Sequence, residues 1–453
     1  MDFDAYFHSL RGKKIAVLGL GVSNRPLVKL LLSYGCTVVG CDRTPREKLD
    51  QEVLELEQQG CSLSLGETYL DDVTADVVFR TPGMHPGNPG IVRLRENGAQ
   101  ITSEMEVFFE LCPCPILAVT GSDGKTTTTT LVAEMLKAEG KTVWLGGNIG
   151  TPLLPICNQI KASDYAVVEL SSFQLMDMQC SAQRAMITNL SPNHLDVHKD
   201  MEEYVEAKKN IYRFQDDQGL LIVNADNALT APLQGNGTTY SFSRQGKPGS
   251  RVTLQDDRIC LDGKEVLRTE DILLPGVHNV ENYMAAILMV EGLVSVQTVA
   301  KVAKTFGGVE HRIELVRVKD GVRYYNDSIA SSPSRTVAGL RSFSKKVILI
   351  AGGYDKQIPF TDLGPEICSR AKAVYLNGAT AGAMKQAIQS APNYIPGSPE
   401  LVECADFADA VQKACAGASA GDIVLMSPAC AAFDQFKNFV ERGNFFKNMI
   451  REL

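Results

Sequence analysis

Residues 115–138 read PILAVTGSDGKTTTTTLVAEMLKA, an apolar stretch, a short loop with two glycines, and then a Thr-rich run. The apolar residues predict a buried strand, and the periodicity of the second run predicts a helix. Between them, Gly121 and Gly124 permit a tight backbone path. Unpaired N–H groups and the helix dipole favour an anion at such a junction. The stretch therefore predicts an α/β domain with a phosphate-binding loop.

The loop itself, TGSDGKTT, carries residues that suit a nucleotide. Lys125 would supply a charge to the β- and γ-phosphates, and Thr126 a hydroxyl to Mg²⁺. The usual spacing is G-x-x-x-x-G-K-[ST], whereas Gly121 lies only three positions before Gly124, so we expect a shortened loop. A glycine turn followed by a surface lysine is the alternative.

Strands and helices alternate on both sides of this stretch. Near the N-terminus, a helical run lies between two strand-like stretches, KIAVLGLGVSN and TVVGCD. A further series of strands and helices begins with VRYYNDS and KKVILIAGG and ends in a helix over residues 434–453. We expect three α/β domains in series, at 1–113, 114–308 and 309–453, the first and third of them Rossmann-like. Short alternating strands between about residues 238 and 266 predict a small antiparallel patch.

Composition excludes several classes of protein. Hydrophobic residues make up 44% and charged residues 22% of the 453 residues, which predicts an ordered, multidomain globular protein. A formal net charge of -8 without a basic run argues against a nucleic acid partner. The N-terminus lacks the features of a signal peptide and no apolar run could span a membrane, so we expect a cytoplasmic protein with reduced, mostly buried cysteines.

Polar residues also follow the strands of the middle segment. Glu169 comes at the end of YAVVELSS, and His194 follows the next strand in NHLDVH, with Asp196 and His198 just beyond. Ligands bind at this edge of open α/β sheets, and a carboxylate there suits Mg²⁺. A zinc protease motif is excluded, because the Glu of H-E-x-x-H is missing. Lys208 lies on the following helical stretch, where a solvated lysine is the alternative.

The first glycine loop is ambiguous. Gly19 and Gly21 match the first two glycines of a dinucleotide fingerprint, but Asn24 replaces the third. Asp42 ends the next strand, where an acid that binds ribose would lie. Both an oxidoreductase cofactor and the phosphate of a nucleotide sugar fit this loop.

Taken in order along the chain, the motifs resemble the Mur ligase family of cell-wall synthesis. They are GSDGKTT, Gly147-Asn148-Ile149-Gly150, ELSSFQL, SPNHLDVH, EYVEAKKNIY, LPGVHNVEN, Glu310-His311-Arg312 and NDSIASSPSRT. The stretch SPACAAFDQFKNFVERGNFFK, together with AGGYDK, is similar to the members that add D-glutamate. The resemblance covers the whole chain. It implies that the first domain binds a uridine nucleotide, the second ATP, and the third the incoming amino acid.

The resemblance also implies roles for individual residues. The catalytic set would be Lys125, Glu169, His194 and Lys208, and two Mg²⁺ ions would be held by Thr126, Glu169, His194 and a carbamate on Lys208. The expected ATP contacts are Gly121, Ser122, Asp123, Gly124, Lys125, Thr126, Thr127, His278, Asn279, Asn282, Arg312 and Asp327. The expected contacts to the UDP-linked substrate are Gly21, Val22, Ser23, Asp42, Arg43, Thr44, Gly83, Asn148 and Ser171. Those to D-glutamate are Ser331, Lys356, Ala432, Phe433 and Phe439.

The implied reaction is ATP-dependent joining of D-glutamate to UDP-N-acetylmuramoyl-L-alanine through an acyl phosphate, by a monomer. Two positions depart from the family pattern. Ile329 stands where Lys is frequent, and Ala432 stands where Ser is frequent, so we expect fewer contacts to phosphate and to glutamate. The alternatives are a Mur-type ligase for another amino acid, although no DNPR-type motif is present, folylpolyglutamate synthase, which lacks a uridine domain, and a catalytically silent nucleotide-binding regulator.

Overall fold

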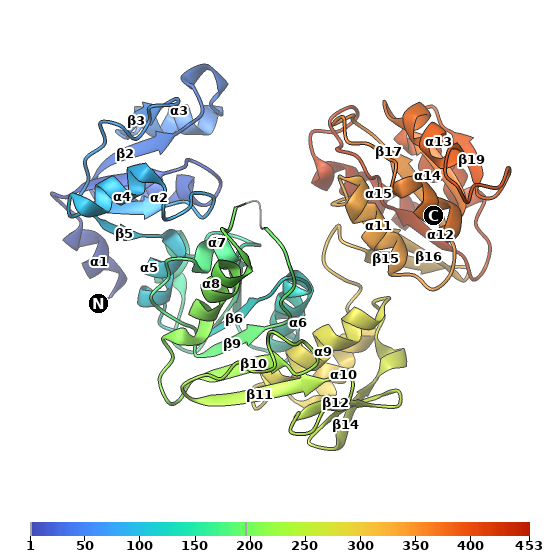
Figure 1. The fold of residues 1–453 in the computed structure, drawn as a ribbon, viewed down its shortest axis with the longest axis horizontal. Helices are drawn as coiled ribbons and strands as arrows, with labels where there is room; N and C mark the ends of the chain where they lie inside the picture. Colours follow the sequence, from blue (N-terminus) through green and yellow to red (C-terminus); the bar gives the residue numbers. More distant parts are fainter. Residues whose placement is uncertain (1, 195–196) are drawn as a thin grey trace. The chain divides into compact units, whose positions relative to one another are not determined.

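A computed structural model describes residues 2–194 and 197–453, whose strands form three sheets (Figure 1). The chain divides into two compact units. The first comprises the residues up to Thr269 together with Glu281–Val302, and the second comprises Glu270–Val280 together with Ala303–Leu453. The first two sheets lie in the first unit and the third sheet lies in the second. The α/β fold class predicted from the sequence is confirmed.

The first sheet is parallel throughout, in the order β3-β2-β1-β4-β5. Successive side chains of a strand point to opposite faces. In β1, Ile15 and Val17 therefore join the core with α2 and α3, whereas Ala16 and Leu18 pack with α4 on the other face. The bounds are α1 (Phe3–Ser9), β1 (Lys14–Leu18), α2 (Asn24–Ser33), β2 (Thr37–Asp42), η1 (Arg46–Lys48), α3 (Gln51–Gln58), β3 (Ser62–Leu65), β4 (Val77–Arg80), α4 (Pro89–Glu96), β5 (Gln100–Thr102) and α5 (Glu104–Leu111).

The second sheet has the order β14-β13-β12-β11-β10-β9-β6-β8-β7. The strands from β7 to β11 in this order are parallel, and β12, β13 and β14 form an antiparallel meander at the edge. The bounds are β6 (Ile116–Thr120), α6 (Lys125–Ala138), β7 (Val143–Gly147), η2 (Leu154–Gln159), β8 (Tyr165–Glu169), α7 (Ser172–Leu175), β9 (Arg184–Ile187), α8 (Met201–Arg213), β10 (Leu220–Asn224), β11 (Thr238–Ser243), β12 (Val252–Gln255), β13 (Arg258–Leu261), β14 (Lys264–Arg268), η3 (Thr269–Asp271), α9 (Val277–Val290) and α10 (Val296–Thr305).

The third sheet has the order β15-β16-β20-β17-β18-β19, parallel except for the pair β15 and β16. Leu349 of β17 packs with α11, α12 and α13, whereas Ile350 packs with α14 and α15 on the opposite face. The bounds are β15 (Glu314–Lys319), β16 (Val322–Asn326), α11 (Pro333–Arg341), β17 (Val347–Gly352), α12 (Leu363–Arg370), β18 (Ala371–Asn377), α13 (Ala381–Gln389), β19 (Glu400–Glu403), α14 (Phe407–Ala416), β20 (Ile423–Met426) and α15 (Phe439–Glu452).

Two local expectations differ from the structure. The final helix begins at Phe439 and not at residue 434, because the Asn438 side chain caps it by accepting the N–H of Glu441. The antiparallel patch begins at β12, since β11 pairs in parallel with β10. Both differences arise from contacts that apolar periodicity does not reveal.

A buried hydrogen bond links α5, which follows the first sheet, to η2, which follows β7 of the second sheet. Glu104, the first residue of α5, accepts the N–H of Leu154 in η2 at 2.8 Å. Burial raises the pKa of this carboxyl to about 7. Nearby, Trp144 on β7 is half-buried and donates its indole N–H to Asp164 at 3.0 Å.

All twelve cysteines lie in the described part of the chain and each is free, mostly in buried positions, as expected for reduced thiols. Among the described residues, no helix is long and apolar enough to cross a membrane.

Candidate active site

The phosphate loop joins β6 to α6 at the carboxyl edge of the second sheet, as the sequence predicts. Gly124 has a φ of 77° and immediately precedes the helix. The loop is held by the segment that follows β9: the N–H of Ser122 donates to Asn189 O at 2.9 Å, and its hydroxyl donates to Ser191 O at 3.0 Å. Lys125 Nζ folds back onto Ser122 O at 2.9 Å. The loop therefore places a lysine ammonium beside the N-terminal N–H groups of α6, an arrangement suited to phosphate.

Glu169 ends β8 beside this loop, and its side chain is buried. Asn148, which follows β7, donates its amide to Glu169 Oε1 at 2.7 Å. The second oxygen, Oε2, is buried and has no hydrogen-bond partner among the described residues. A buried carboxylate oxygen without a partner is costly, so this atom fits a cation ligand.

Lys208 reaches the same sheet edge from α8 and is almost fully buried. Its Nζ donates to Thr120 Oγ1 at 3.1 Å and to Gly121 O at 2.9 Å. Burial lowers the pKa of Lys208 well below its usual value, the positive charge of Lys125 lowers it further, and Glu169 opposes the shift. The surface-lysine alternative is wrong for this residue, and its burial favours the neutral form of the amine.

His194 follows β9 with a φ of 55°, and its ring lies 5.1 Å from that of Phe173. His198 is buried, stacks on Phe173 and contacts Ser172 Oγ through Nε2 at 2.9 Å. Burial lowers the pKa of His198, which favours its neutral form. Asp196, noted in the sequence, lies outside the described residues.

The residues of this edge fit Mg²⁺. Within residues 2–194 and 197–453, no three His, Cys, Asp or Glu side chains are grouped as a metal site. Glu169 Oε2, which has no hydrogen-bond partner among the described residues, could nevertheless serve as a metal ligand. The Thr126 hydroxyl, a second possible ligand, lies in the first turn of α6. An added carboxylate on Lys208 would supply the further oxygen ligands that Mg²⁺ requires.

Asn282 packs against the phosphate loop. Its Oδ1 accepts the Thr128 hydroxyl at 3.2 Å, and a Cβ built on Gly124 would lie 2.4 Å from the same oxygen. The other predicted ATP contacts, His278, Asn279, Arg312 and Asp327, lie in the second unit, and their role toward ATP stays a prediction.

The predicted uridine contacts lie in the loops that follow β1, β2 and β4, at one edge of the first sheet. Gly21, Val22 and Ser23 are exposed between β1 and α2. Asp42 accepts the N–H of Leu20 at 2.8 Å and that of Thr44 at 2.9 Å. Burial alone would raise the pKa of Asp42, but these hydrogen bonds outweigh it and lower the pKa.

The remaining contacts predicted for that substrate lie in the same unit. Arg43 and Gly83 are exposed in loops, and Asn148 is exposed beside Glu169. Ser171 caps α7 by accepting the N–H of Gln174 at 3.2 Å, which gives it a structural role as well.

In the second unit, Asp327 follows β16 and is buried. It accepts the Ser427 hydroxyl at 2.7 Å, and burial raises the pKa of its carboxyl to about 7. Arg312 is exposed, and Ile329 is half-buried. The predicted D-glutamate residues lie around the carboxyl ends of β16, β17 and β20: Ser331, Lys356, Ala432, Phe433 and Phe439.

These five residues differ in how far their side chains are exposed to solvent. Lys356 and Phe433 are exposed, Ser331 and Phe439 are half-buried, and Ala432 is buried. The ring of Phe433 lies 5.8 Å from that of Tyr354, beside the loop that carries Lys356. The structure thus brings the polypeptide segments of the predicted pocket together within one unit.

The sequence missed two residues that shape the Lys208 site. Thr120 accepts a hydrogen bond from Lys208, and the ring of Tyr204 lies 4.8 Å from Nζ. The Tyr204 hydroxyl also contacts Ser122 Oγ at 2.9 Å. Tyr204 lies four residues before Lys208 on α8, a spacing that places both on one helical face. That spacing was the available signal.

Comparison with protein families gives two matches. The Mur ligase middle domain matches residues 119–290, and the Mur ligase glutamate ligase domain matches residues 311–430.

Full-length relatives are similar along the whole chain. The UDP-N-acetylmuramoylalanine–D-glutamate ligase of Clostridium novyi is 48% identical, over 100% of this chain and 99% of its own. The ligase of the same name from Clostridium botulinum strain Hall is 49% identical over 100% and 99%, and that of Acetivibrio thermocellus is 49% identical over 98% and 97%.

Solved structures share the fold at low sequence identity. The UDP-N-acetylmuramate–alanine ligase of Thermotoga maritima superimposes with a TM-score of 0.57 at 19% identity, covering 97% of this chain and 99% of that one. A UDP-N-acetylmuramoyl-L-alanyl-D-glutamate–2,6-diaminopimelate ligase gives a TM-score of 0.59 at 16% identity, covering 92% and 93%.

Proposed function

This chain belongs to the Mur ligase family, and from that premise we propose how its own residues carry out the ligation. The protein is an ATP-dependent ligase that joins D-glutamate to UDP-N-acetylmuramoylalanine in the synthesis of peptidoglycan precursors. In this proposal the first glycine loop binds the uridine nucleotide of the substrate and not a dinucleotide cofactor.

The phosphate loop and Lys125 bind the triphosphate of ATP. The N–H groups at the start of α6 follow a loop that is held by Asn189 and Ser191, so the loop needs little rearrangement when the ligand arrives. The Lys125 ammonium neutralises charge on the transferring phosphoryl group. The substrate carboxylate takes the γ-phosphoryl group, ADP leaves, and an acyl phosphate results. The amine of D-glutamate then attacks the acyl carbon, which forms the amide bond and releases inorganic phosphate and a proton.

Thr126, Glu169, His194 and Lys208 hold Mg²⁺ in this proposal. When bound, Mg²⁺ supplies charge neutralisation at the phosphoryl oxygens. Asn148 fixes the orientation of Glu169 through Oε1 and leaves Oε2 free as a ligand.

The observation that carries the proposal is the environment of Lys208. Burial lowers the pKa of Lys208 and so favours the neutral amine, the form that attacks CO₂. Attack of the neutral amine forms one N–C bond, opens one C=O π bond of CO₂ and releases one proton, which leaves a carbamate with one negative charge. Tyr204 and Thr120 contact the Lys208 amine at the sheet edge, where the carbamate would form.

We place the uridine end of the substrate at Gly21–Ser23, Asp42–Thr44 and Gly83, and its muramoyl part near Asn148 and Ser171. D-Glutamate would contact Ser331, Lys356, Phe433 and Phe439, with Ala432 lacking a hydroxyl. The domain boundaries at 113/114 and 308/309, a cytoplasmic location and a monomeric state, without a nucleic acid or membrane partner, complete the proposal.

A phosphate-release assay with a panel of substrates tests this function. We expect release to require ATP, Mg²⁺, UDP-N-acetylmuramoyl-L-alanine and D-glutamate together. Equal turnover with L-lysine or diaminopimelate in place of D-glutamate would refute the amino acid assignment. Nucleotide binding without any turnover would instead identify a silent regulator on this scaffold.

A further inference from the structure

Arg442 is a buried cation that none of the ligand roles above uses. It is the fourth residue of α15, and its side chain is 2% exposed. None of the ion pairs between described residues includes it. Burial lowers the pKa of its guanidinium to about 10, so the group stays charged at neutral pH. A buried charge without a paired carboxylate is costly, and its retention calls for a physical explanation.

The partners of Arg442 are neutral oxygens from two loops. Nη1 donates to Ala431 O at 3.1 Å, and Nη2 donates to Cys430 O at 3.1 Å. Nη2 also donates to Ser328 O at 3.0 Å, and Nε donates to Ser328 Oγ at 3.1 Å. One guanidinium therefore joins the loop after β20 to the loop after β16.

These hydrogen bonds set the direction of the peptide groups. In a trans peptide the C=O and the following N–H point in opposite directions. Because the carbonyl of Ala431 is turned toward Arg442 and toward the N–H of Tyr354, the N–H of Ala432 is turned away from them. Neither Ala432 nor Phe433 donates its N–H to another described residue. Free N–H groups of consecutive residues suit an anion.

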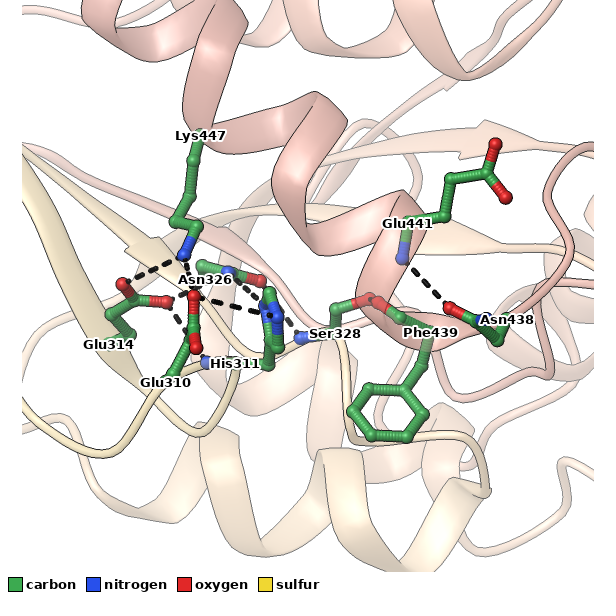
Figure 2. Close-up of polar contacts among 9 residues, drawn as sticks. All are labelled: Glu310, His311, Glu314, Asn326, Ser328, Asn438, Phe439, Glu441 and Lys447. Atoms are coloured by element: carbon green, nitrogen blue, oxygen red, sulfur yellow. Dashed lines mark hydrogen bonds and ion pairs between the residues drawn. The ribbon is translucent and has the colours of Figure 1, made fainter. Parts of the chain in front are cut away.

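Ser328 extends the same link to the start of α15. Its hydroxyl donates to Phe439 O at 2.7 Å, and Figure 2 shows it beside Phe439 at that end of the helix. On the same helix, Lys447 pairs with Glu310 and, at 3.4 Å, with Glu314. The helix is thus bound to the 310–314 segment at one place and to the predicted amino acid pocket at another.

We propose that Arg442 is a positioning residue for the amino acid pocket: its guanidinium holds the carbonyls of Cys430 and Ala431 so that the N–H of Ala432 faces the carboxylate of an acidic amino acid. The N–H of Phe433 lies next to it in the chain, in a peptide whose carbonyl, Ala432 O, accepts the N–H groups of Gln435 and Phe436. This inference rests on the proposed function, which places D-glutamate at this loop. It also accounts for how the pocket binds an acid although Ala432 offers no hydroxyl.

The test is steady-state kinetics of the full-length enzyme with Arg442→Lys. Lysine keeps the charge but cannot make four hydrogen bonds to the two loops. We expect the KM for D-glutamate to rise about tenfold or more, with the KM for ATP unchanged and kcat within about threefold of the parent. A uniform loss in all parameters, or no change in the KM for D-glutamate, overturns the inference.

Two further variants separate positioning from general damage. Arg317→Lys is the matched control, because Arg317 donates to Ile450 O at 3.1 Å and to Arg451 O at 2.6 Å at the other end of α15; we expect parental kinetics. Ser328→Ala removes one link and should raise the KM for D-glutamate about threefold, a result that stands if Arg442→Lys does not fold. A parent enzyme that does not use D-glutamate refutes the proposed function, whereas unchanged variants of an active parent refute this inference alone.

Discussion

Two buried basic side chains, Lys208 in the first unit and Arg442 in the second, meet the same physical problem in different ways. Lys208 has two oxygen acceptors and the nearby charge of Lys125, and its pKa falls well below the usual value. Arg442 makes four hydrogen bonds and stays charged. A lysine amine can lose its proton and react, whereas a guanidinium cannot. The difference indicates that the first site is built for chemistry and the second for orientation.

The largest expected effect comes from replacing Lys208, whose amine forms the carbamate in the proposed mechanism. Lys208→Ala and Lys208→Arg should each lower phosphate release by on the order of a thousandfold, because neither side chain forms a carbamate and metal-derived stabilisation of several kcal/mol is lost. Short-chain carboxylates should partly restore Lys208→Ala. Lys209→Ala is the control, since Lys209 pairs with Glu206 on the helix surface. Full activity of Lys208→Arg would remove the carbamate from the mechanism.

Glu169→Gln tests whether the unpartnered oxygen beside Lys208 is a metal ligand. We expect the Mg²⁺ concentration for half-maximal activity to rise at least about tenfold, because an amide is a poorer ligand than a carboxylate. The control is Glu134→Gln, which alters a carboxylate that pairs with Lys137. An unchanged Mg²⁺ titration would assign Glu169 a structural role with Asn148.

Glu104 extends the comparison to a buried acid whose pKa is raised to about 7 from 4.5. The folded state binds this proton more tightly than the unfolded state, so stability falls as the pH rises from about 4.5 to 7. Glu104→Gln stays neutral and can still accept the N–H of Leu154. Its free energy of unfolding relative to the parent should therefore increase by about 2 kcal/mol between pH 5 and pH 8.

Urea unfolding at the two pH values measures this difference. Glu110→Gln, on the exposed side of the same helix, should give no such trend. A parallel pH dependence of the parent and Glu104→Gln would mean that Glu104 is ionised in the folded state.

The smallest effect is expected at the pocket that Arg442 supports. Ala432→Ser restores a hydroxyl near the expected carboxylate and should lower the KM for D-glutamate about threefold, the effect of one added hydrogen bond. Measurement of this KM at saturating ATP is sufficient. An unchanged value would show that the N–H groups of the loop already satisfy the carboxylate.

The first site was more visible in the sequence than the second. Lys125 begins a predictable helix and Glu169 ends a predictable strand, and the carboxyl ends of parallel strands meet at one edge, so periodicity was enough to bring these two together. Lys208 lies in the middle of α8 and was assigned to the site by the family resemblance. Arg442 resembled any helical arginine, because its partners are backbone carbonyls and one hydroxyl in loops far along the chain. Every residue has a backbone carbonyl, so residue types do not indicate which carbonyls accept hydrogen bonds from a buried arginine. The start of α15 was misplaced for a similar reason, since only the Asn438 cap distinguishes it.

The chain has one tryptophan, Trp144, and it lies on β7 four residues before Asn148. Its indole is half-buried and hydrogen-bonded to Asp164, an environment that holds the ring in a defined orientation. The protein thus carries its single indole fluorophore, which can be excited selectively over tyrosine, on the strand that leads to its proposed substrate site. Changes in emission on adding nucleotide or substrate can be attributed to one strand without labelling or mutation.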